Sequence, residues 1–470
     1  MPVSSSFSPS RAHLDLGEVL YDVVAPAEFP KLTLRHRDQR SAARVGLDTL
    51  TDEEWVAHFG RFEPLPGSFE EPLALRYHGH QFRHYNADLG DGRGFLFAQL
   101  HDLQDGRLLD LATKGSGQTP WSRGADGRLT LKGGVREILA TSLLEALGVE
   151  TSKSFSLIET GEELFRNDEP SPTRAAVLVR LSHSHLRIGT FQRLAFHQDA
   201  DTMRRLLSHI VMRYLPEAEA PTEAERIARF FAATSRRVAR MGAQWMAAGF
   251  VHGVLNTDNI NITGESFDYG PWRFLPKYDP AFTAAYFDHG GLYAYGRQPE
   301  TLQWNLARLG GSLLLLEGNA DLKSPLQEEL NAFGPVFQRE FATAVLWRLG
   351  LTPREPERDA TLAAAFFTAL QESEAPFEQA FFDWRGGRRR DGYEGPAFQG
   401  VREALAGYEP SGPSHPYFER QRPCTLLIEE VEALWAPIAE RDDWQPLAEK
   451  LAEIETVRQA YAGITGCLTG

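Results

Sequence analysis

One stretch near the middle of the chain constrains the fold more than any other. It runs from His252 to Gly270 and reads HGVLNTDNINITGESFDYG. Its acidic, amide and apolar residues are spaced to form a loop, a short strand and a second loop. Asp258 and Asn259 fall in the first loop and Asp268 in the second, so the stretch could present metal ligands. A pair of plain turns is the alternative, because Asp and Asn both favour turns.

The stretch resembles the catalytic and metal-binding loops of kinase-fold enzymes. Small-molecule kinases of that fold read His-Gly-Asp, then four residues, then Asn, and protein kinases carry Asp-Phe-Gly where this chain has Asp268-Tyr-Gly. Aligning His252 places Asn259 on the magnesium-binding Asn and Val254 on the catalytic base. A valine cannot accept a proton, so an ordinary phosphotransferase would lack its central residue. Asp258 is the nearby carboxylate that could replace it.

A glycine-rich run upstream is a candidate phosphate-binding loop. Gly90, Gly92 and Gly94 surround Arg93 directly before the strand-like residues 95–100. Glycines let backbone amides approach a phosphate closely, and Arg93 adds positive charge. A plain hairpin turn has the same composition and is the preferred interpretation from these residues alone.

A second strand, residues 108–113, ends at Lys114. A lysine at this place resembles the kinase lysine that holds nucleotide phosphates, and such a lysine needs an acidic partner. The helix expected from 134 to 148 offers Glu137 in its first turn, and Glu145 is the rival partner. A surface glutamate favoured by the helix dipole is the alternative interpretation of Glu137.

Two further groups complete the candidate site. Asp126-Gly127 marks a turn that could close over a nucleotide. The buried strand expected at 175–181 contains Arg180, and Arg187 follows it in the chain. The guanidinium groups of both arginines could reach one phosphate. Surface salt bridges are an equally good interpretation of the two arginines.

The chain becomes helical from about residue 190. Thr222 to Gly249 predicts one long buried helix that leads into the His252 loop. Near the N-terminus, Thr51 and Glu54 predict a capped helix at 52–58. The Arg- and Pro-rich stretch 385–423 predicts a loop or linker, and its basic run 385–390 predicts a solvated loop. Further helices are expected at 302–309, 326–349, 360–371, 425–435 and 446–461.

These elements predict an α+β chain with a protein-kinase-like bilobal fold. The expected parts are an N-terminal extension (1–70), a strand-rich N-lobe that binds nucleotide phosphates (71–190), a helical C-lobe with the catalytic and metal-binding loops (191–390) and a C-terminal helical extension (391–470).

Composition excludes several classes of function. A net charge of -15 argues against a nucleic-acid binder, because neutralising phosphates needs clustered Lys and Arg. Cys424 and Cys467 are the only cysteines, so a reducing compartment is expected. No apolar run is long enough to span a membrane. The N-terminus lacks the pattern of a secretory signal, and a mitochondrial presequence is only weakly supported, so we expect a cytoplasmic protein.

Several strings in order resemble the selenoprotein O family, also called YdiU, from about residue 72 to 308. They are Gly79-His-Gln-Phe82, Leu89-Gly-Asp-Gly-Arg93, Lys114-Gly-Ser-Gly117, Arg136-Glu137, and His252 to Asn259 with Asp268-Tyr-Gly270. Members of this family have a kinase fold but transfer AMP rather than phosphate. The resemblance implies a protein adenylyltransferase that acts on Ser, Thr or Tyr hydroxyls of other proteins.

The resemblance also implies a role for each candidate residue. ATP would bind in a flipped orientation with its γ-phosphate near Lys114, Arg180 and Arg187. Asp258 would act as base, and Glu137 would orient Lys114. Asn259 and Asp268 would hold Mg²⁺, with Mn²⁺ and UMP transfer as a variant. Nucleotide contacts would come from Gly90, Gly92, Arg93, Asp126, Gly127 and Asp268.

Some residues depart from the family pattern. Arg83 stands where the family has Gly after His-Gln-Phe. Some members pair an activation-segment cysteine with one near the C-terminus; Cys467 fits the second place, but residues 277–286 contain no cysteine, so that redox switch is not expected here. A kinase that uses Asp258 as a shifted base and an inactive nucleotide-binding scaffold remain the alternatives. The acceptor proteins and the oligomeric state do not follow from the sequence.

Overall fold

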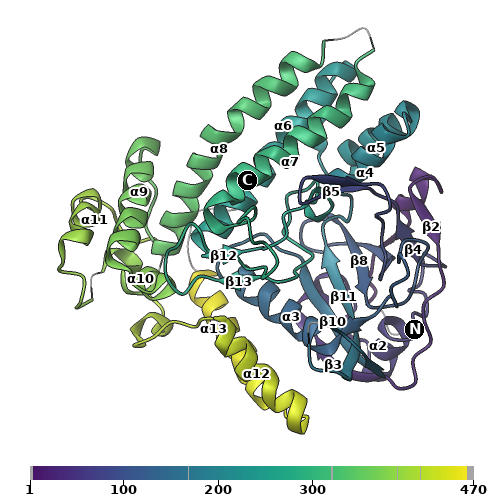
Figure 1. Cartoon of the computed structure of the whole chain (residues 1–470), viewed down its shortest axis with the longest axis horizontal. Coiled ribbons are helices and arrows are strands. Elements are labelled where there is room, and N and C mark those ends of the chain that lie inside the picture. Colours follow the sequence, from purple (N-terminus) through teal and green to yellow (C-terminus); the bar gives the residue numbers. More distant parts are fainter. Residues whose placement is uncertain (1–3, 168, 319–320, 389, 413, 463–470) are drawn as a thin grey trace.

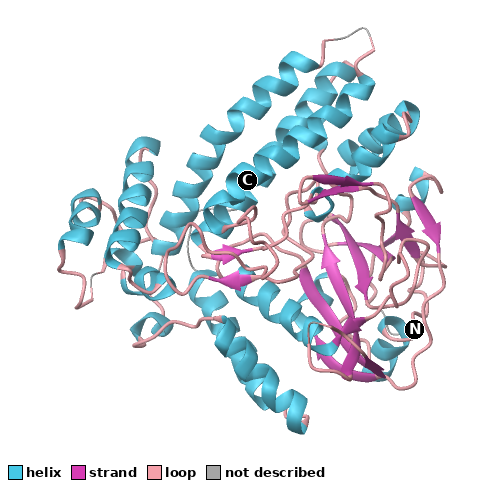
Figure 2. Ribbon diagram, in the orientation of Figure 1, coloured by secondary structure: helices cyan, strands magenta, loops and turns pink. Residues whose placement is uncertain are grey.

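The computed structural model describes residues 4–167, 169–318, 321–388, 390–412 and 414–462. It is a mixed fold in which a large antiparallel sheet lies beside many helices (Figures 1 and 2). The strands are β1 (Pro9–Ser10), β2 (Tyr21–Val23), β3 (Thr33–Arg37), β4 (Leu73–Leu75), β5 (Gly79–Gln81), β6 (His84–Asn86), β7 (Leu96–His101), β8 (Leu108–Lys114), β9 (Leu129–Thr130), β10 (Lys153–Leu164), β11 (Thr173–Ser182), β12 (Phe250–Val251) and β13 (Arg273–Phe274). The helices are α1 (Gln39–Arg44), α2 (Asp52–Phe59), α3 (Leu131–Ala146), α4 (Ile188–Phe196), α5 (Ala200–Arg213), α6 (Glu223–Ala247), α7 (Gln298–Leu313), α8 (Lys323–Leu349), α9 (Pro356–Ser373), α10 (Phe377–Asp383), α11 (Gln399–Ala404), α12 (Ile428–Arg441) and α13 (Gln445–Ala462).

The main sheet has nine strands, and its central order is β2-β4-β7-β8-β11-β10-β3. β1 pairs with β7, and β9 pairs with β11. Three of these strands, β1 to β3, come from residues 1–70, so the N-terminal segment is built into the sheet. β5 and β6 form a separate hairpin, in which Gly79 lies opposite Asn86.

The two faces of the sheet bury different side chains, as the alternation of a strand requires. On β11, Val177 and Val179 join a core rich in aromatic residues that includes Trp55 of α2. Ala176 and Leu178, which point the other way, join the core that contains α3 and most of the later helices. The sheet is therefore covered on both faces, and α3 is held against the face nearer the helical half.

The later helices form most of the second half of the chain. The long helices α6, α7 and α8 pack side by side (Figure 1). α6 is the long helix expected from Thr222, and the Thr222 side chain caps its N-terminus. α13 returns to pack on α3. None of the helices in the described ranges is long and apolar enough to cross a membrane.

Several sequence predictions can be compared directly with these elements. The capping box of Thr51 and Glu54 is present at the start of α2, which confirms that prediction. α3 begins at Leu131, earlier than expected, because Thr130 caps it through Gly133. In place of the short strand expected inside the His252 stretch there are two isolated bridges, one between Asn261 and Arg187 and one between Ser266 and Thr151. α11 lies within the expected linker 385–423, and Cys467 falls outside the described residues.

The prediction of a solvated basic loop at 385–390 is wrong for Arg385 and Arg390, whereas Arg388 is exposed and Arg389 lies outside the described residues. Arg385 is buried, and its guanidinium lies 4.8 Å from the centre of the Phe418 ring. Arg390 forms an ion pair of 3.3 Å with Asp383 and lies over the Phe382 ring. Aromatic faces and backbone carbonyls satisfy these guanidinium groups inside the fold, which a count of charges along the sequence does not reveal.

Candidate active site

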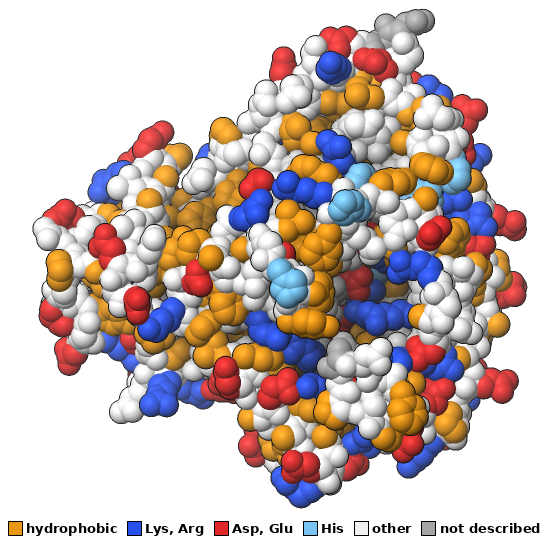
Figure 3. Space-filling view, in the orientation of Figure 1, with side chains coloured by type: hydrophobic (Ala, Val, Ile, Leu, Met, Phe, Trp, Pro, Cys, Tyr) orange, Lys and Arg blue, Asp and Glu red, His pale blue; other side chains and the backbone are white. Residues whose placement is uncertain are grey.

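A pocket of about 320 Å³ collects most of the candidate residues. It lies between the sheet and the loops that follow α6, and Figure 3 shows Lys and Arg side chains gathered around a hollow on this face. The predicted residues that line it are Gly90, Gly92, Arg93, Lys114, Arg180, Arg187, Asp258 and Asp268. Those outside its lining are Asp126, Gly127, Glu137 and Asn259.

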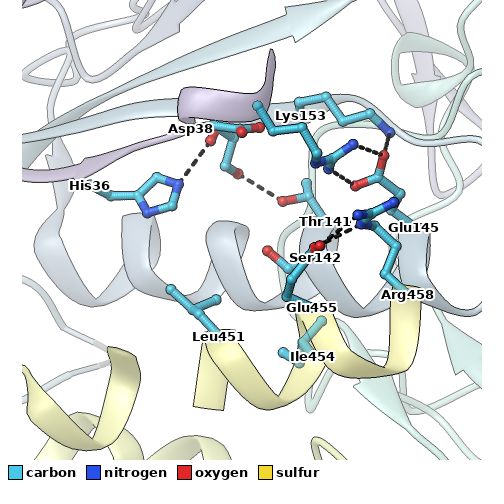
Figure 4. A pocket seen from close by; sticks show the side chains of 12 residues that line it. His36, Asp38, Thr141, Ser142, Glu145, Lys153, Leu451, Ile454, Glu455 and Arg458 are labelled. Carbon is cyan, nitrogen blue, oxygen red and sulfur yellow. Dashed lines mark hydrogen bonds and ion pairs between the residues drawn. The ribbon is translucent and has the colours of Figure 1, made fainter. Parts of the chain in front are cut away.

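Lys114, at the end of β8, forms a buried ion pair with Glu137 of α3. Its ammonium group also lies 3.0 Å from a carboxylate oxygen of Asp268. Glu145, the rival partner, is occupied elsewhere: it pairs with Arg40 and, at 3.0 Å, with Lys153 (Figure 4). α3 therefore presents Glu137, and not Glu145, to the lysine.

Asp268 is surrounded by cations. Arg180 donates to its Oδ1 at 3.1 Å, and Arg187 lies 3.8 Å from its Oδ2. Burial alone would raise the pKa of Asp268, but Lys114, Arg180 and Arg187 hold it well below its usual value. Asp268 therefore stays ionised, and the three cations meet at one point where the phosphates of a nucleotide could share them.

Asp258 has the opposite environment. It lies in a short 3-10 turn, Thr257–Asn259, and its Oδ1 is buried without a hydrogen-bond partner in the described part of the chain. Burial, with a smaller contribution from nearby Asp268, raises its pKa to about 6, against the lowering effect of Arg187. A carboxylate with this pKa can accept a proton near neutral pH.

Asn259 is half-buried beside Asp258, outside the pocket lining. Its side-chain nitrogen donates to the carbonyl of Val254 at 3.0 Å. One N–H of the amide is therefore occupied, and the amide oxygen is the atom that can bind a cation.

The β5–β6 hairpin holds the Asp258 loop, a contact that was not predicted from the sequence. The backbone amide of His80 donates to the hydroxyl of Thr257 at 2.7 Å, and that of Phe82 to the side chain of Asn256 at 3.1 Å. A Cβ on Gly79 would lie 2.8 Å from Oδ1 of Asp258. A glycine within a strand often marks such a close approach, which is the signal that was available.

Gly90 and Gly92 leave room for the neighbouring loop that contains Trp121 and Ser122. A Cβ on Gly90 would collide with the Trp121 ring, and one on Gly92 would lie 2.8 Å from the Trp121 carbonyl. Ser122 donates to the Gly92 carbonyl at 2.6 Å. Residues 90–94 do not form a hairpin turn, because no ladder joins β6 to β7.

In the turn at Asp126, neither Asp126 nor Gly127 lines the pocket. The carboxylate of Asp126 pairs with Arg166 at 2.8 Å, and Gly127 is packed against Gly117. Only Ala125 of this turn lines the pocket.

Asp91 is a pocket residue that the sequence analysis did not select. Its carboxylate accepts from Arg187 at 3.1 Å and from the backbone amide of Leu75 at 3.1 Å. Tyr77 supports the same guanidinium, which lies 4.3 Å from its ring centre. Both residues fix the direction of Arg187.

Comparison with known proteins shows the family to which this chain is related. The family model described as "Protein adenylyltransferase SelO" matches residues 4–393. The chain belongs to the SelO family. It is 44% identical to "Protein nucleotidyltransferase YdiU" of Gloeobacter violaceus (96% of this chain, 95% of the relative) and 42% identical to the protein of the same name from Trichormus variabilis (94% of each).

Membership of the SelO family extends well beyond the range 72–308 expected from the motifs. A third relative of the same name, from Synechococcus elongatus, is 51% identical over 72% of this chain and 67% of its own length. Nucleotidyl transfer is the activity named for the family and for these relatives, so the chain is assigned to the nucleotidyltransferases.

Arg83 lies at a position where the backbone favours glycine. Its φ is 64°, in the left-handed region. The side chain pairs with Glu300 at 3.2 Å and lies over the Trp304 ring. These contacts offset part of the strain of placing a side chain here.

Replacing Glu137 tests the Lys114 ion pair. We expect Glu137→Gln to lower nucleotidyl transfer at least about tenfold, because a buried lysine without its partner loses its fixed position, and to cost about 3 kcal/mol of stability. Glu145→Gln, in the same helix, is the matched control: it also loses an ion-paired carboxylate but should keep transfer within about twofold. Equal losses of transfer in both variants would contradict the assignment.

Replacing Gly79 tests the contact between hairpin and loop. We expect Gly79→Ala to lower transfer about 10- to 100-fold while the protein stays folded, because the new methyl group displaces the Asp258 side chain. Gly334→Ala, whose Cβ meets no atom within 4 Å, is the control and should keep full activity. Initial rates and melting curves of the two variants decide the question; unchanged rates for Gly79→Ala would show that the contact is unimportant.

Proposed function

We propose that this protein is a protein adenylyltransferase that moves AMP from ATP to Ser, Thr or Tyr hydroxyls of other proteins. The observation that carries the proposal is the convergence of Lys114, Arg180 and Arg187 on Asp268, beside a base position occupied by Val254. Three buried cations suit a departing pyrophosphate better than a single transferred phosphate. ATP is then bound in a flipped orientation, with its α-phosphate facing the acceptor.

In the proposed reaction the acceptor oxygen attacks the α-phosphorus. A new oxygen–phosphorus bond forms, the bond between the α-phosphorus and the bridging oxygen breaks, and pyrophosphate leaves. Asp258 takes the proton of the hydroxyl, which its raised pKa allows. Lys114, Arg180 and Arg187 stabilise the charge that develops on the pyrophosphate.

The donor atoms suit Mg²⁺. The ionised carboxylate of Asp268 and the free amide oxygen of Asn259 are hard oxygen ligands, and magnesium commonly uses one or two such groups together with substrate phosphates. The ion, when bound, would supply further neutralisation of phosphate charge. Mn²⁺ has the same preference and fits the same ligands.

The fold behind this function is proposed to be kinase-like and bilobal. The supporting features are Lys114 at the end of β8, its partner Glu137 on α3, and the long α6 that leads into the Asp258 loop. In this proposal residues 71–190 form the N-lobe and 191–390 the C-lobe, extended by 1–70 and 391–470, and the protein works in the cytoplasm.

Labelled ATP tests the function. The purified protein is incubated with Mg²⁺, a generic protein acceptor and ATP labelled at the α- or the γ-phosphate in parallel. We expect protein-bound label from the α position only. Label from the γ position alone would indicate a kinase with Asp258 as a shifted base, and no label with retained ATP binding would indicate an inactive scaffold. Labelled UTP with Mn²⁺ tests UMP transfer.

A further inference from the structure

A second cavity lies directly behind the hairpin that holds the Asp258 loop. It is an open groove of about 400 Å³ between the hairpin, α4 and α7. Figure 3 shows basic, histidine and hydrophobic side chains gathered where α7 meets β5, on the face that carries the hollow of the active site. Its lining includes His80, Tyr85, Gln192, Phe196, Ala307 and Arg308.

The groove and the nucleotide pocket share one strand. Consecutive side chains of β5 point to opposite faces, so His80 lines the groove and Gln81 lines the nucleotide pocket. Gln192, in the groove, accepts the hydroxyl hydrogen bond of Thr257 at 2.5 Å and lies 2.6 Å from His80 Nδ1. An occupant of the groove would therefore be held beside the residue that precedes Asp258.

The walls of the groove are unusually apolar for a surface. Tyr85 and Phe196 are two of the few large hydrophobic side chains that the described residues expose, at 38% and 57%. Their rings are stacked, with centres 5.7 Å apart. Ala307 of α7 faces them from the opposite wall. An exposed aromatic pair of this kind is typical of a surface that receives an apolar side chain.

The charge on the groove lining is positive and comes from Arg308. Arg308 is exposed over the Trp304 ring, and no carboxylate of the described residues lies within 4.0 Å of its guanidinium. None of the lining residues is acidic. In a chain with a net charge of -15, an arginine left without a carboxylate at the edge of an apolar groove favours an acidic partner.

We propose that this groove docks the acceptor protein. The docked segment carries an apolar side chain that fits between Phe196 and Ala307, and an Asp or Glu that pairs with Arg308, a few residues from the hydroxyl that reaches Asp258. This inference rests on the proposed function and adds the sequence preference of its substrate. The hairpin then has two faces, one toward the nucleotide and one toward the acceptor.

Synthetic peptides test the docking site. Each contains one Ser and, at spacings from three to eight residues, a Leu-Glu pair, with Leu-Lys and Ala-Ala peptides as matched controls. The readout is kcat/KM for transfer of AMP from α-labelled ATP. We expect the best Leu-Glu peptide to exceed its Leu-Lys counterpart at least about tenfold, because docking adds an ion pair and buried apolar area.

Variants of the protein test which groove residues cause the preference for Leu-Glu peptides. Arg308→Glu should reverse the Glu over Lys preference, and Ala307→Trp should abolish the Leu preference, while melting temperature and ATP binding stay unchanged. Arg339→Glu, at an exposed arginine of α8, is the control and should behave as the wild type. A wild type without any preference, or an Arg308→Glu variant that keeps it, overturns the docking site alone. Failure to transfer AMP to any peptide or protein removes the proposed function and this inference together.

Discussion

Asp268→Ala should reduce AMP transfer by about a thousandfold or more, the largest loss expected from a single substitution here. The substitution removes the carboxylate that we propose as a metal ligand and that also pairs with three cations. It should also lower stability by about 3 kcal/mol in the absence of nucleotide, because Lys114, Arg180 and Arg187 are left close together without the carboxylate that they share.

Two comparisons make the Asp268 experiment specific. Asp268→Asn keeps the size of the side chain but removes its negative charge. A decrease in AMP transfer that both variants share is therefore caused by the missing charge. ATP should stabilise Asp268→Ala against heat more than it stabilises the wild type, since its phosphates replace the missing negative charge. Unchanged turnover in either variant would remove Asp268 from the reaction.

Asp258→Asn should lower transfer by about 10²- to 10⁴-fold, the usual contribution of a general base. The wild-type rate should rise with pH through an apparent pKa of about 6, since only the ionised carboxylate accepts the proton. The variant should lack this rise. Rates at saturating ATP and metal across the range of pH decide the point, and equal turnover of the variant and the wild type would exclude the role of base.

The same substitution should make the protein more stable. The folded protein binds the Asp258 proton more tightly than the unfolded chain does, so the wild type loses stability as the pH rises from about 4 to about 6. The loss is on the order of 3 kcal/mol at neutral pH, and Asp258→Asn avoids it. Denaturant unfolding at pH 7 measures the gain. A less stable variant would show that the carboxylate is better solvated than its burial indicates.

The parts of the fold that the sequence predicts well are set by neighbouring residues. The capping box of Thr51 depends on contacts within one turn, and the long helix α6 follows from the periodicity of its apolar residues. Glu137 could be proposed as the partner of Lys114 because its place in the first turn of α3 follows from helical periodicity. Such features need only local rules.

The parts that the sequence missed depend on contacts between distant segments. A glycine in a strand indicates a close approach, but nothing near Gly79 in the chain identifies Asp258 as the neighbour, and nothing near Asp91 indicates that it orients Arg187. Arg385 is buried because a ring from residue 418 covers it. Long-range pairings of this kind are set by the whole fold, which local pattern does not contain.

A structure of the protein with Mg²⁺ and a non-hydrolysable ATP analogue would show the direction of the triphosphate in the pocket. We expect the α-phosphorus to lie nearest Asp258 and the terminal phosphate to contact Lys114, Arg180 and Arg187. A terminal phosphate that points at Asp258, with the two arginines distant from it, would rule out transfer of AMP from a flipped ATP.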